Sequence, residues 1–109
     1  SQASITAIAG ESVYCASKGG LNMLTKALAL EWGPEGINVN AVAPTFVRTP
    51  GTAERLDTRE FRENVLKMIP LGRVGSLTDV AAAVIYLASP AGSMVNGEIL
   101  VVDGGWTIH

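Results

Sequence analysis

Apolar side chains recur at helical spacing along residues 13–32, in two stripes rather than one. The stripes consist of Leu21, Leu24, Leu28 and Trp32, and of Ala16, Gly20, Met23, Ala27 and Leu30. Only a narrow polar stripe separates them, so the pattern predicts a long helix that is buried on most of its sides. Gly33-Pro34 and Gly36 are expected to end this helix, because glycine suits the C-terminal cap and proline cannot continue the helical hydrogen bonds.

Two other segments have the pattern of β-strands. Residues 37–43 alternate in character, with β-branched side chains, and stop at Pro44. Residues 98–102 form a nearly continuous apolar run, which is typical of a strand buried on both faces of a parallel sheet. Two strands make a poor sheet, so we expect further strands outside this chain, one of them ahead of a loop at residues 1–12.

The segment between the two strands predicts a loop and two helices. Residues 45–58, which contain proline, glycine and several threonines, predict the loop, and residues 60–68 predict a short amphipathic helix. At residues 76–79 the Ser76 hydroxyl can accept a hydrogen bond from the Asp79 N–H, which indicates the start of another helix. Loop, helix, strand, helix, helix and strand in this order predict an α/β fold.

Composition narrows the function classes. The 109 residues are 48% hydrophobic and 17% charged, which excludes a disordered chain. A net charge of −2 argues against a nucleic-acid partner, and no apolar run is long enough for a membrane span. A single cysteine cannot form an internal disulfide, so nothing indicates secretion and we expect a cytoplasmic protein. A chain that is this short and this apolar is expected to be a piece of a larger protein, or a subunit that buries its faces against partners.

Tyr14 and Lys18 stand four residues apart near the start of the first predicted helix, on one face of it. A lysine ammonium beside a phenol favours the phenolate, and this makes the tyrosine a usable general acid and base. The spacing alone favours an ordinary exposed pair.

The wider context is more specific, because the segment that contains Tyr14 and Lys18 is the first of six motifs that follow one another in order. They are Tyr14-Cys15-Ala16-Ser17-Lys18, Asn38-Val39-Asn40-Ala41-Val42-Ala43-Pro44, Pro70-Leu71-Gly72-Arg73-Val74-Gly75, Asp79-Val80-Ala81, Asn96-Gly97-Glu98 and Val102-Asp103-Gly104-Gly105. This set resembles the C-terminal part of the short-chain dehydrogenase/reductase family, from residue 1 to about residue 106. The resemblance implies the C-terminal portion of a Rossmann-like, doubly wound parallel sheet. Residues 1–109 would then be part of a single NAD(P)-binding domain.

The resemblance also implies an activity, the interconversion of a ketone or aldehyde and an alcohol by hydride transfer. Tyr14 would be the general acid and base, and Lys18 would hold the hydroxyls of the nicotinamide ribose. Ser1 falls where the family has the serine that polarises the substrate oxygen, with Ser4 as the competing candidate. The cofactor would be NAD or NADP, and the substrate a small alcohol or carbonyl compound.

Residues after the first predicted strand would complete the cofactor site in this family. Pro44, Val47 and Thr49 would bind the cofactor, in a segment that lies over the nicotinamide. Val47 would offer backbone groups to the carboxamide, and Thr49 would approach the carboxamide or the pyrophosphate. Here the chain departs from the family pattern, because Thr45 stands where glycine is usual, and the backbone at residue 45 must therefore avoid left-handed conformations. Residues 45–68 would form a lid over the substrate, with its preference set by Thr52, Arg55, Leu56 and Phe61.

Other family features are absent from this sequence, among them the glycine-rich pyrophosphate loop and the catalytic asparagine. We therefore keep an alternative, a non-catalytic interaction module derived from the same fold. The second apolar stripe of helix 13–32 predicts that copies of the protein associate. Members of the family that the chain resembles commonly pair through this helix and through the last helix and strand, which implies a dimer or tetramer. Arg73 is expected to anchor a loop, and Asp103-Gly104-Gly105 to turn the chain rather than bind a metal.

Overall fold

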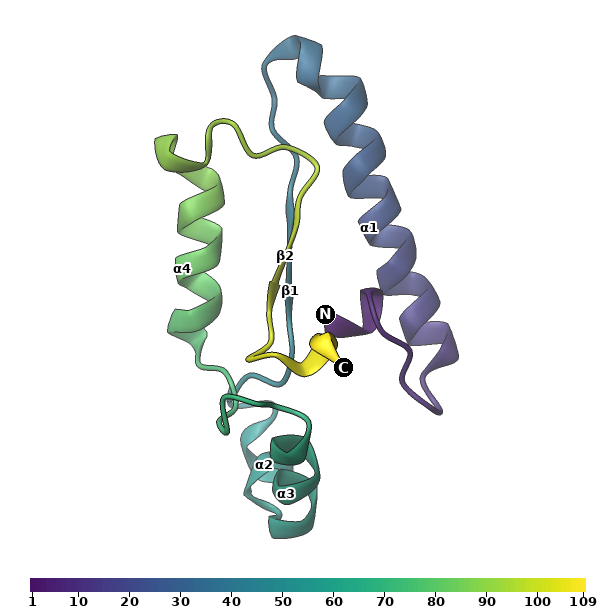
Figure 1. The fold of residues 1–109 in the computed structure, drawn as a ribbon, viewed down its shortest axis with the longest axis vertical. Helices are drawn as coiled ribbons and strands as arrows, with labels where there is room; N and C mark the ends of the chain where they lie inside the picture. The colour runs from purple at the N-terminus through teal and green to yellow at the C-terminus, as the bar shows by residue number, and fades with distance from the viewer.

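The computed structural model describes residues 1–109, and its centre is a sheet of two parallel strands between two long helices (Figure 1). The strands are β1, Ala41–Pro44, and β2, Ile99–Val102. Helix α1, Ser12–Trp32, lies on one side of the sheet, and α4, Leu77–Ala88, lies on the other. This layering confirms the predicted α/β class.

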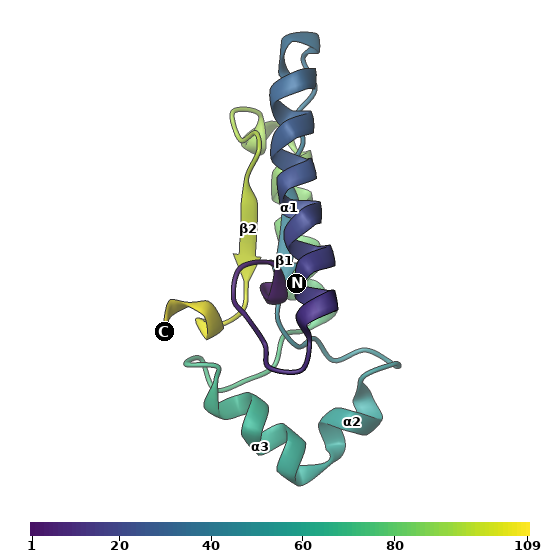
Figure 2. The ribbon, with the colours of Figure 1, turned by 90° about the vertical axis from the view of Figure 1, so that its right-hand side faces the viewer.

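Two short helices form a lobe beyond the carboxyl ends of the strands (Figure 2). Helix α3, Arg59–Lys67, agrees with the helix expected at residues 60–68. Helix α2, Ala53–Asp57, shows that the loop expected at residues 45–58 was wrong in its second half. So short a helix has one buried apolar side chain, Leu56, and its sequence carries no periodicity that would reveal it.

Strand β1 begins later than its pattern indicated. The predicted strand covers residues 37–43, whereas pairing with β2 starts only at Ala41. Before that point one backbone hydrogen bond, from the Gly97 N–H to the Val39 carbonyl at 2.8 Å, joins the two segments. Side chains supply further connections, because the amides of Asn38 and Asn40 both donate to the Val95 carbonyl, at 2.7 and 2.9 Å. Asparagine side chains compete with the backbone for such partners, and here they supply most of the connection between the two segments ahead of the paired strands.

The two long helices begin and end at the signals that predict them. Helix α1 starts at Ser12 and is followed by Gly36, whose φ of 76° lies in the left-handed region that glycine tolerates. At the start of α4 the Ser76 hydroxyl accepts the Asp79 N–H at 3.2 Å, and the Asp79 carboxylate accepts the Ser76 N–H at 2.7 Å. This reciprocal capping box confirms the predicted helix start.

Arg73 anchors the loop ahead of α4, as expected. Its guanidinium donates to both oxygens of Asp79, at 2.7 and 3.1 Å. The Arg73 pairing, together with hydrogen bonds from Ser76, holds the pKa of Asp79 well below its ordinary value.

Few residues are buried in this chain, and the largest fully buried side chains are Leu56 and Ile69. The expectation that helix 13–32 is buried on most sides is wrong within these residues, since Val13 and Leu30 are 83% and 81% exposed. The strand expected to be buried on both faces is only half-buried, because β2 pairs with β1 alone. None of the helices combines the length and the apolar character that a membrane span requires.

Candidate functional site

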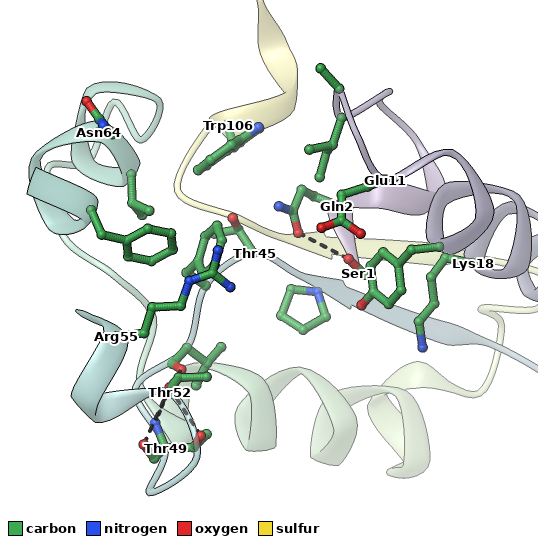
Figure 3. Close-up of a pocket in the computed structure, with 18 residues that line it drawn as sticks. Ser1, Gln2, Glu11, Lys18, Thr45, Thr49, Thr52, Arg55, Asn64 and Trp106 are labelled. Carbon is green, nitrogen blue, oxygen red and sulfur yellow. Dashed lines mark hydrogen bonds between the residues drawn. The ribbon is translucent and has the colours of Figure 1, made fainter. Parts of the chain in front are cut away.

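A cavity of about 830 Å³ opens at the carboxyl ends of β1 and β2 (Figure 3). Its walls come from the loop before α1, the first turns of α1, the segment after β1, the α2–α3 lobe and the turn after β2. Ligands of parallel α/β sheets bind at this end of the strands, because the loops that follow neighbouring strands converge there. The cavity brings together six of the candidate catalytic and cofactor residues: Ser1, Tyr14, Lys18, Pro44, Val47 and Thr49.

Tyr14 and Lys18 share one face of α1, as their spacing predicts. The Lys18 ammonium lies 5.4 Å from the centre of the Tyr14 ring, within the range of a cation–π contact. Lys18 takes part in none of the three ion pairs of the chain, so its charge is available to a ligand in the cavity. Tyr14 is 44% exposed at the cavity wall.

The two candidate serines occupy different places. The Ser1 hydroxyl lies at the cavity, accepts the Ala3 N–H at 3.2 Å and donates to the Gln2 side chain at 3.3 Å. The Ser4 hydroxyl instead donates to the Ser1 carbonyl at 2.7 Å, and Ser4 does not line this cavity. Of the two hydroxyls, only that of Ser1 can therefore reach a ligand beside Tyr14.

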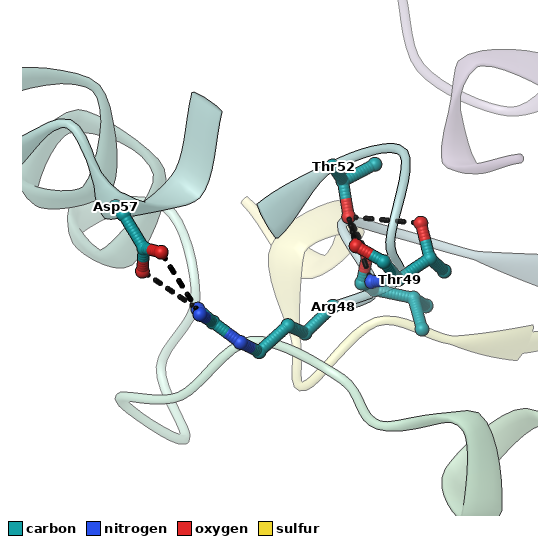
Figure 4. Close-up of polar contacts among 5 residues, drawn as sticks. Arg48, Thr49, Thr52 and Asp57 are labelled. Atoms are coloured by element: carbon teal, nitrogen blue, oxygen red, sulfur yellow. Dashed lines mark hydrogen bonds and ion pairs between the residues drawn. The ribbon is translucent and has the colours of Figure 1, made fainter. Parts of the chain in front are cut away.

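The segment after β1 is shaped by Thr52 (Figure 4). Its hydroxyl donates to the Val47 carbonyl at 2.6 Å and accepts the Thr49 N–H at 2.9 Å. The Val47 carbonyl is thereby occupied, whereas the Val47 N–H makes no hydrogen bond within the chain and remains free for a ligand. Arg48 points the other way and forms a two-pronged ion pair with Asp57, at 2.9 and 3.0 Å.

Thr45 contributes a feature that motif reading does not reveal. Its hydroxyl oxygen is buried and has no hydrogen-bond partner, and the residue lines the cavity. As expected, the Thr45 backbone stays out of the left-handed region, where no residue other than glycine is found in this chain. A buried hydroxyl without a partner costs free energy, so this oxygen is a polar group that no residue of this chain satisfies.

Aromatic rings form a wall of the cavity that the sequence did not indicate, apart from Phe61. The rings of Phe46 and Phe61 pack edge to face with their centres 5.5 Å apart, and the centres of the Phe46 and Trp106 rings are 5.8 Å apart. Trp106 follows the turn after β2, while Phe46 follows β1, so only the parallel pairing of the strands brings them together. The Arg55 guanidinium lies 4.2 Å from the centre of the Phe61 ring and also lines the cavity.

The Asp103 carboxylate holds the turn that carries Trp106. It accepts the Gly105 N–H at 2.9 Å, and the Thr107 N–H and hydroxyl at 2.8 Å each. Burial alone would raise the pKa of Asp103, but these hydrogen bonds outweigh it and lower the pKa below the ordinary value. Asp103 therefore turns the chain, as expected. A Cβ on Gly104 would come within 2.6 Å of Ile69, so the turn packs closely against the α3 end.

One expectation about an individual residue is not met. Leu56 was expected to influence substrate preference from the lid, but it is 1% exposed and lies in the core of the α2–α3 lobe rather than at the cavity. Gly19 and Gly20 of α1 make no close contact within this chain. A Cβ at either position would meet no atom closer than 4.0 Å, so no close approach within this chain requires them.

Comparisons with known proteins agree with this geometry. Residues 1–107 match the family model described as enoyl-(acyl carrier protein) reductase. Galactitol 2-dehydrogenase (L-tagatose-forming) of Cereibacter sphaeroides is 50% identical over 97 residues, which are 89% of this chain and 38% of that protein. A gluconate 5-dehydrogenase from Burkholderia cenocepacia, solved with NADP and tartrate, has a TM-score of 0.93 and 37% identity over 100% of this chain and 43% of its own.

A third relative gives the same result with a different cofactor. The structure of 4-hydroxyisoleucine dehydrogenase complexed with NADH has a TM-score of 0.96 and 31% identity, over 100% of this chain and 45% of its own. The chain thus spans about two fifths of the length of the relatives it matches. It corresponds to part of their Rossmann-type fold and belongs to the short-chain dehydrogenase/reductase family.

Proposed function

We propose that the protein containing this chain is an NAD(P)-dependent oxidoreductase that interconverts a secondary alcohol and a ketone. One observation carries the proposal: Tyr14, Lys18 and the Ser1 hydroxyl line the same cavity, at the carboxyl ends of the parallel strands. A phenol, an ammonium and a second hydroxyl in one cavity supply both a proton donor and hydrogen-bond donors for a carbonyl oxygen.

Tyr14 carries the proton in this proposal. In the direction of oxidation, the substrate loses a hydride from its carbinol carbon and a proton from its hydroxyl, which leaves the ketone. The proton passes to the Tyr14 oxygen, and the hydride carries away two electrons. In reduction Tyr14 returns the proton, while the Ser1 hydroxyl stabilises the negative charge that develops on the substrate oxygen.

The residues present fit the nicotinamide half of a dinucleotide. Lys18 offers an ammonium without a carboxylate partner, which suits ribose hydroxyls. The free N–H of Val47 suits a carboxamide oxygen, and the Thr49 hydroxyl lies nearby in the same cavity. When bound, the nicotinamide supplies or accepts the hydride. Both NADP and NADH appear among the solved relatives, so the family membership alone allows either cofactor.

The substrate is a small hydroxylated compound. The relatives' names mention a hexitol, a sugar acid and a hydroxylated amino acid, which are all polar and all carry a secondary hydroxyl or its ketone. The mixed polar and aromatic walls of the cavity accommodate such compounds, with the hydroxyls facing Ser1 and Thr45.

The test is turnover by the full-length protein after Tyr14→Phe. We expect kcat to fall at least about 100-fold, the usual contribution of a positioned general acid, while NAD(P)(H) still binds. Tyr86→Phe is the matched control, because Tyr86 is equally exposed, at 44%, but lies on α4 away from the cavity. Normal turnover by the Tyr14 variant would show that another group carries the proton.

A specific observation also supports association of copies. The α1 stripe that contains Met23 and Leu30 lies opposite the buried Thr25 and Ala29, and both apolar side chains are more than half exposed. A dimer or tetramer formed through this helix would cover them. The alternative of a non-catalytic interaction module shares this surface, but it predicts no cofactor binding in any assembled state.

A further inference from the structure

Arg55 is the positively charged side chain that the α2–α3 lobe contributes to the cavity. Its guanidinium lies 4.2 Å from the centre of the Phe61 ring and points toward the middle of the cavity (Figure 3). Stacking on a ring uses the flat face of a guanidinium and leaves its edge, with the N–H donors, free. Arg55 thus presents a two-pronged donor from a fixed position, even though the side chain is solvent-exposed in this chain.

The charge of Arg55 has no carboxylate partner, unlike those of Arg48 and Arg59, and Arg62, which is also unpaired, does not line the cavity. The three ion pairs of the chain are Arg48–Asp57, Arg59–Glu63 and Arg73–Asp79. Two of these arginines flank Arg55 in sequence, and each is paired on the outer surface of the lobe or of the preceding loop. Arg55 alone among the three faces the cavity, where a ligand can reach it.

The other charges of the cavity give a direction to this arrangement. Glu11 lies across the cavity from Arg55, on the side of Ser1 and Lys18 (Figure 3). The Lys18 ammonium lies on that side as well, but under the proposed function it holds the ribose of the cofactor. Arg55 is then the cation left for an anionic group of the substrate, and Glu11 repels such a group from the opposite side. The other end of that substrate would then meet Ser1 and Tyr14, the groups that act on the reacting oxygen under the proposed function.

The surroundings of Arg55 strengthen an ion pair there. Phe46 and Phe61 are in contact with each other, and Trp106 extends the same wall. The Phe61 ring covers one face of the guanidinium, and a charge-assisted, two-pronged bond to a carboxylate is among the stronger polar contacts in proteins. The planar fork of an arginine matches the two oxygens of a carboxylate in a way that a single donor does not.

We propose that the substrate is a hydroxy acid, or its oxo acid, whose carboxylate binds Arg55 while its hydroxyl or carbonyl lies between Ser1 and Tyr14. This inference rests on the proposed function and names the substrate class of that site. The carboxylate takes no part in the chemistry. It sets which end of the substrate reaches the reacting groups, so Arg55 determines specificity rather than the proton transfer.

The experiment measures kcat/KM of the full-length protein on pairs of substrates that differ only in the charged group. Suitable pairs are D-gluconate with D-glucitol, and 3-hydroxybutyrate with 3-hydroxybutanamide. We expect the acids to be preferred, and Arg55→Gln to lower kcat/KM for them by roughly tenfold to a hundredfold, the loss typical of a charge-assisted hydrogen bond. Arg55→Gln should change the neutral members little, and Arg55→Lys should restore part of the preference.

Arg59→Gln is the matched control, because Arg59 is an arginine of the same lobe that is paired with Glu63 at 3.0 Å and is 92% exposed. It should leave the acid preference unchanged. Equal or better turnover of the neutral compounds by the unaltered protein would overturn the inference, as would an acid preference that survives Arg55→Gln. So would a failure of every acid to bind, measured by calorimetry with the cofactor present.

The two proposals fail in distinguishable ways. If neutral alcohols are turned over in a Tyr14-dependent manner and acids are not preferred, only the assignment of Arg55 is wrong. If no alcohol or ketone of either kind is turned over with NAD(P)(H), although the cofactor binds, the proposed function is wrong and the Arg55 assignment falls with it.

Discussion

Thr45 has a buried hydroxyl oxygen without a hydrogen-bond partner, and the residue forms part of the wall of the cavity. Replacing an unpaired buried hydroxyl by a methyl group of the same shape removes a desolvation cost. We therefore expect Thr45→Val to raise the free energy of unfolding of the ligand-free protein by about 1 kcal/mol. Chemical denaturation of the full-length protein without substrate measures this change.

The same substitution separates stability from binding. If the Thr45 hydroxyl meets a substrate hydroxyl, Thr45→Val lowers kcat/KM while it stabilises the protein. Thr45→Ser is the control, because it keeps the hydroxyl and loses only the methyl group. A valine variant that is less stable than the unaltered protein would mean that the hydroxyl has a partner in the full-length molecule.

At the residue scale, sequence reasoning found the groups whose chemistry is local and missed those whose position depends on the fold. Tyr14 and Lys18 are one helical turn apart, so their 5.4 Å contact follows from spacing alone. Trp106 and Phe46 are far apart in the chain, and they meet because they follow two parallel strands. The sequence of neither segment predicts that contact, although the Asp-Gly-Gly motif does predict the turn ahead of Trp106.

At the scale of elements, the turn after β2 depends on one carboxylate. Asp103 is 8% exposed and accepts hydrogen bonds from Gly105 and Thr107, and these lower its pKa below the ordinary value of 3.8. A group with a depressed folded-state pKa stabilises the protein above its unfolded-state pKa and loses that contribution as the pH falls through the folded-state pKa. Asp103→Asn should therefore cost on the order of 2 kcal/mol at pH 7.

The pH dependence of stability tests whether the charge of Asp103 is the cause of this stabilisation. The difference in unfolding free energy between the unaltered protein and Asp103→Asn should be constant above about pH 5 and should shrink as the pH falls below 3.8. Chemical denaturation at a series of pH values gives this difference. Asp57→Asn is the control, because that carboxylate forms only an exposed ion pair with Arg48 and should matter little. A difference for Asp103 that does not change with pH would show that its charge is not the cause.

Elements with local start and stop signals were predictable, and elements fixed by distant contacts were not. The capping box at Ser76 and the glycine after α1 mark helix ends through interactions a few residues long. The start of β1 depends instead on Asn38 and Asn40, whose amides bind a loop more than fifty residues away. Helix α2 consists largely of good helix formers, but five residues are too few to form a helix alone, and the burial of Leu56 holds it in place.

At the scale of the whole molecule, apolar side chains are exposed on both α1 and α4, the helices on the two sides of the sheet. On α1 they include Val13, Met23 and Leu30, and on α4 they include Leu77 and Ile85, all of them more than 60% exposed. Scattered exposed apolar residues are normal in proteins, but several of them on two helices are typical of surfaces that pack against other protein, so we expect these faces to be covered in the full-length assembly. Composition indicated this excess, while the structure shows on which helix faces it lies.

Leu30 offers the sharpest test of what covers α1. It lies on the face opposite the buried Ala29 and Thr25 and is 81% exposed. If a second copy packs there, Leu30→Glu removes about 1.5–3 kcal/mol of apolar burial and raises the dissociation constant at least tenfold. Sedimentation velocity of the full-length protein at micromolar concentration should then show smaller species. Met94→Glu is the matched control, since Met94 is 95% exposed and lies outside both helices. An unaltered protein that sediments as a monomer, or a Leu30 variant that is folded by circular dichroism and associates as before, would exclude this face as the contact between copies.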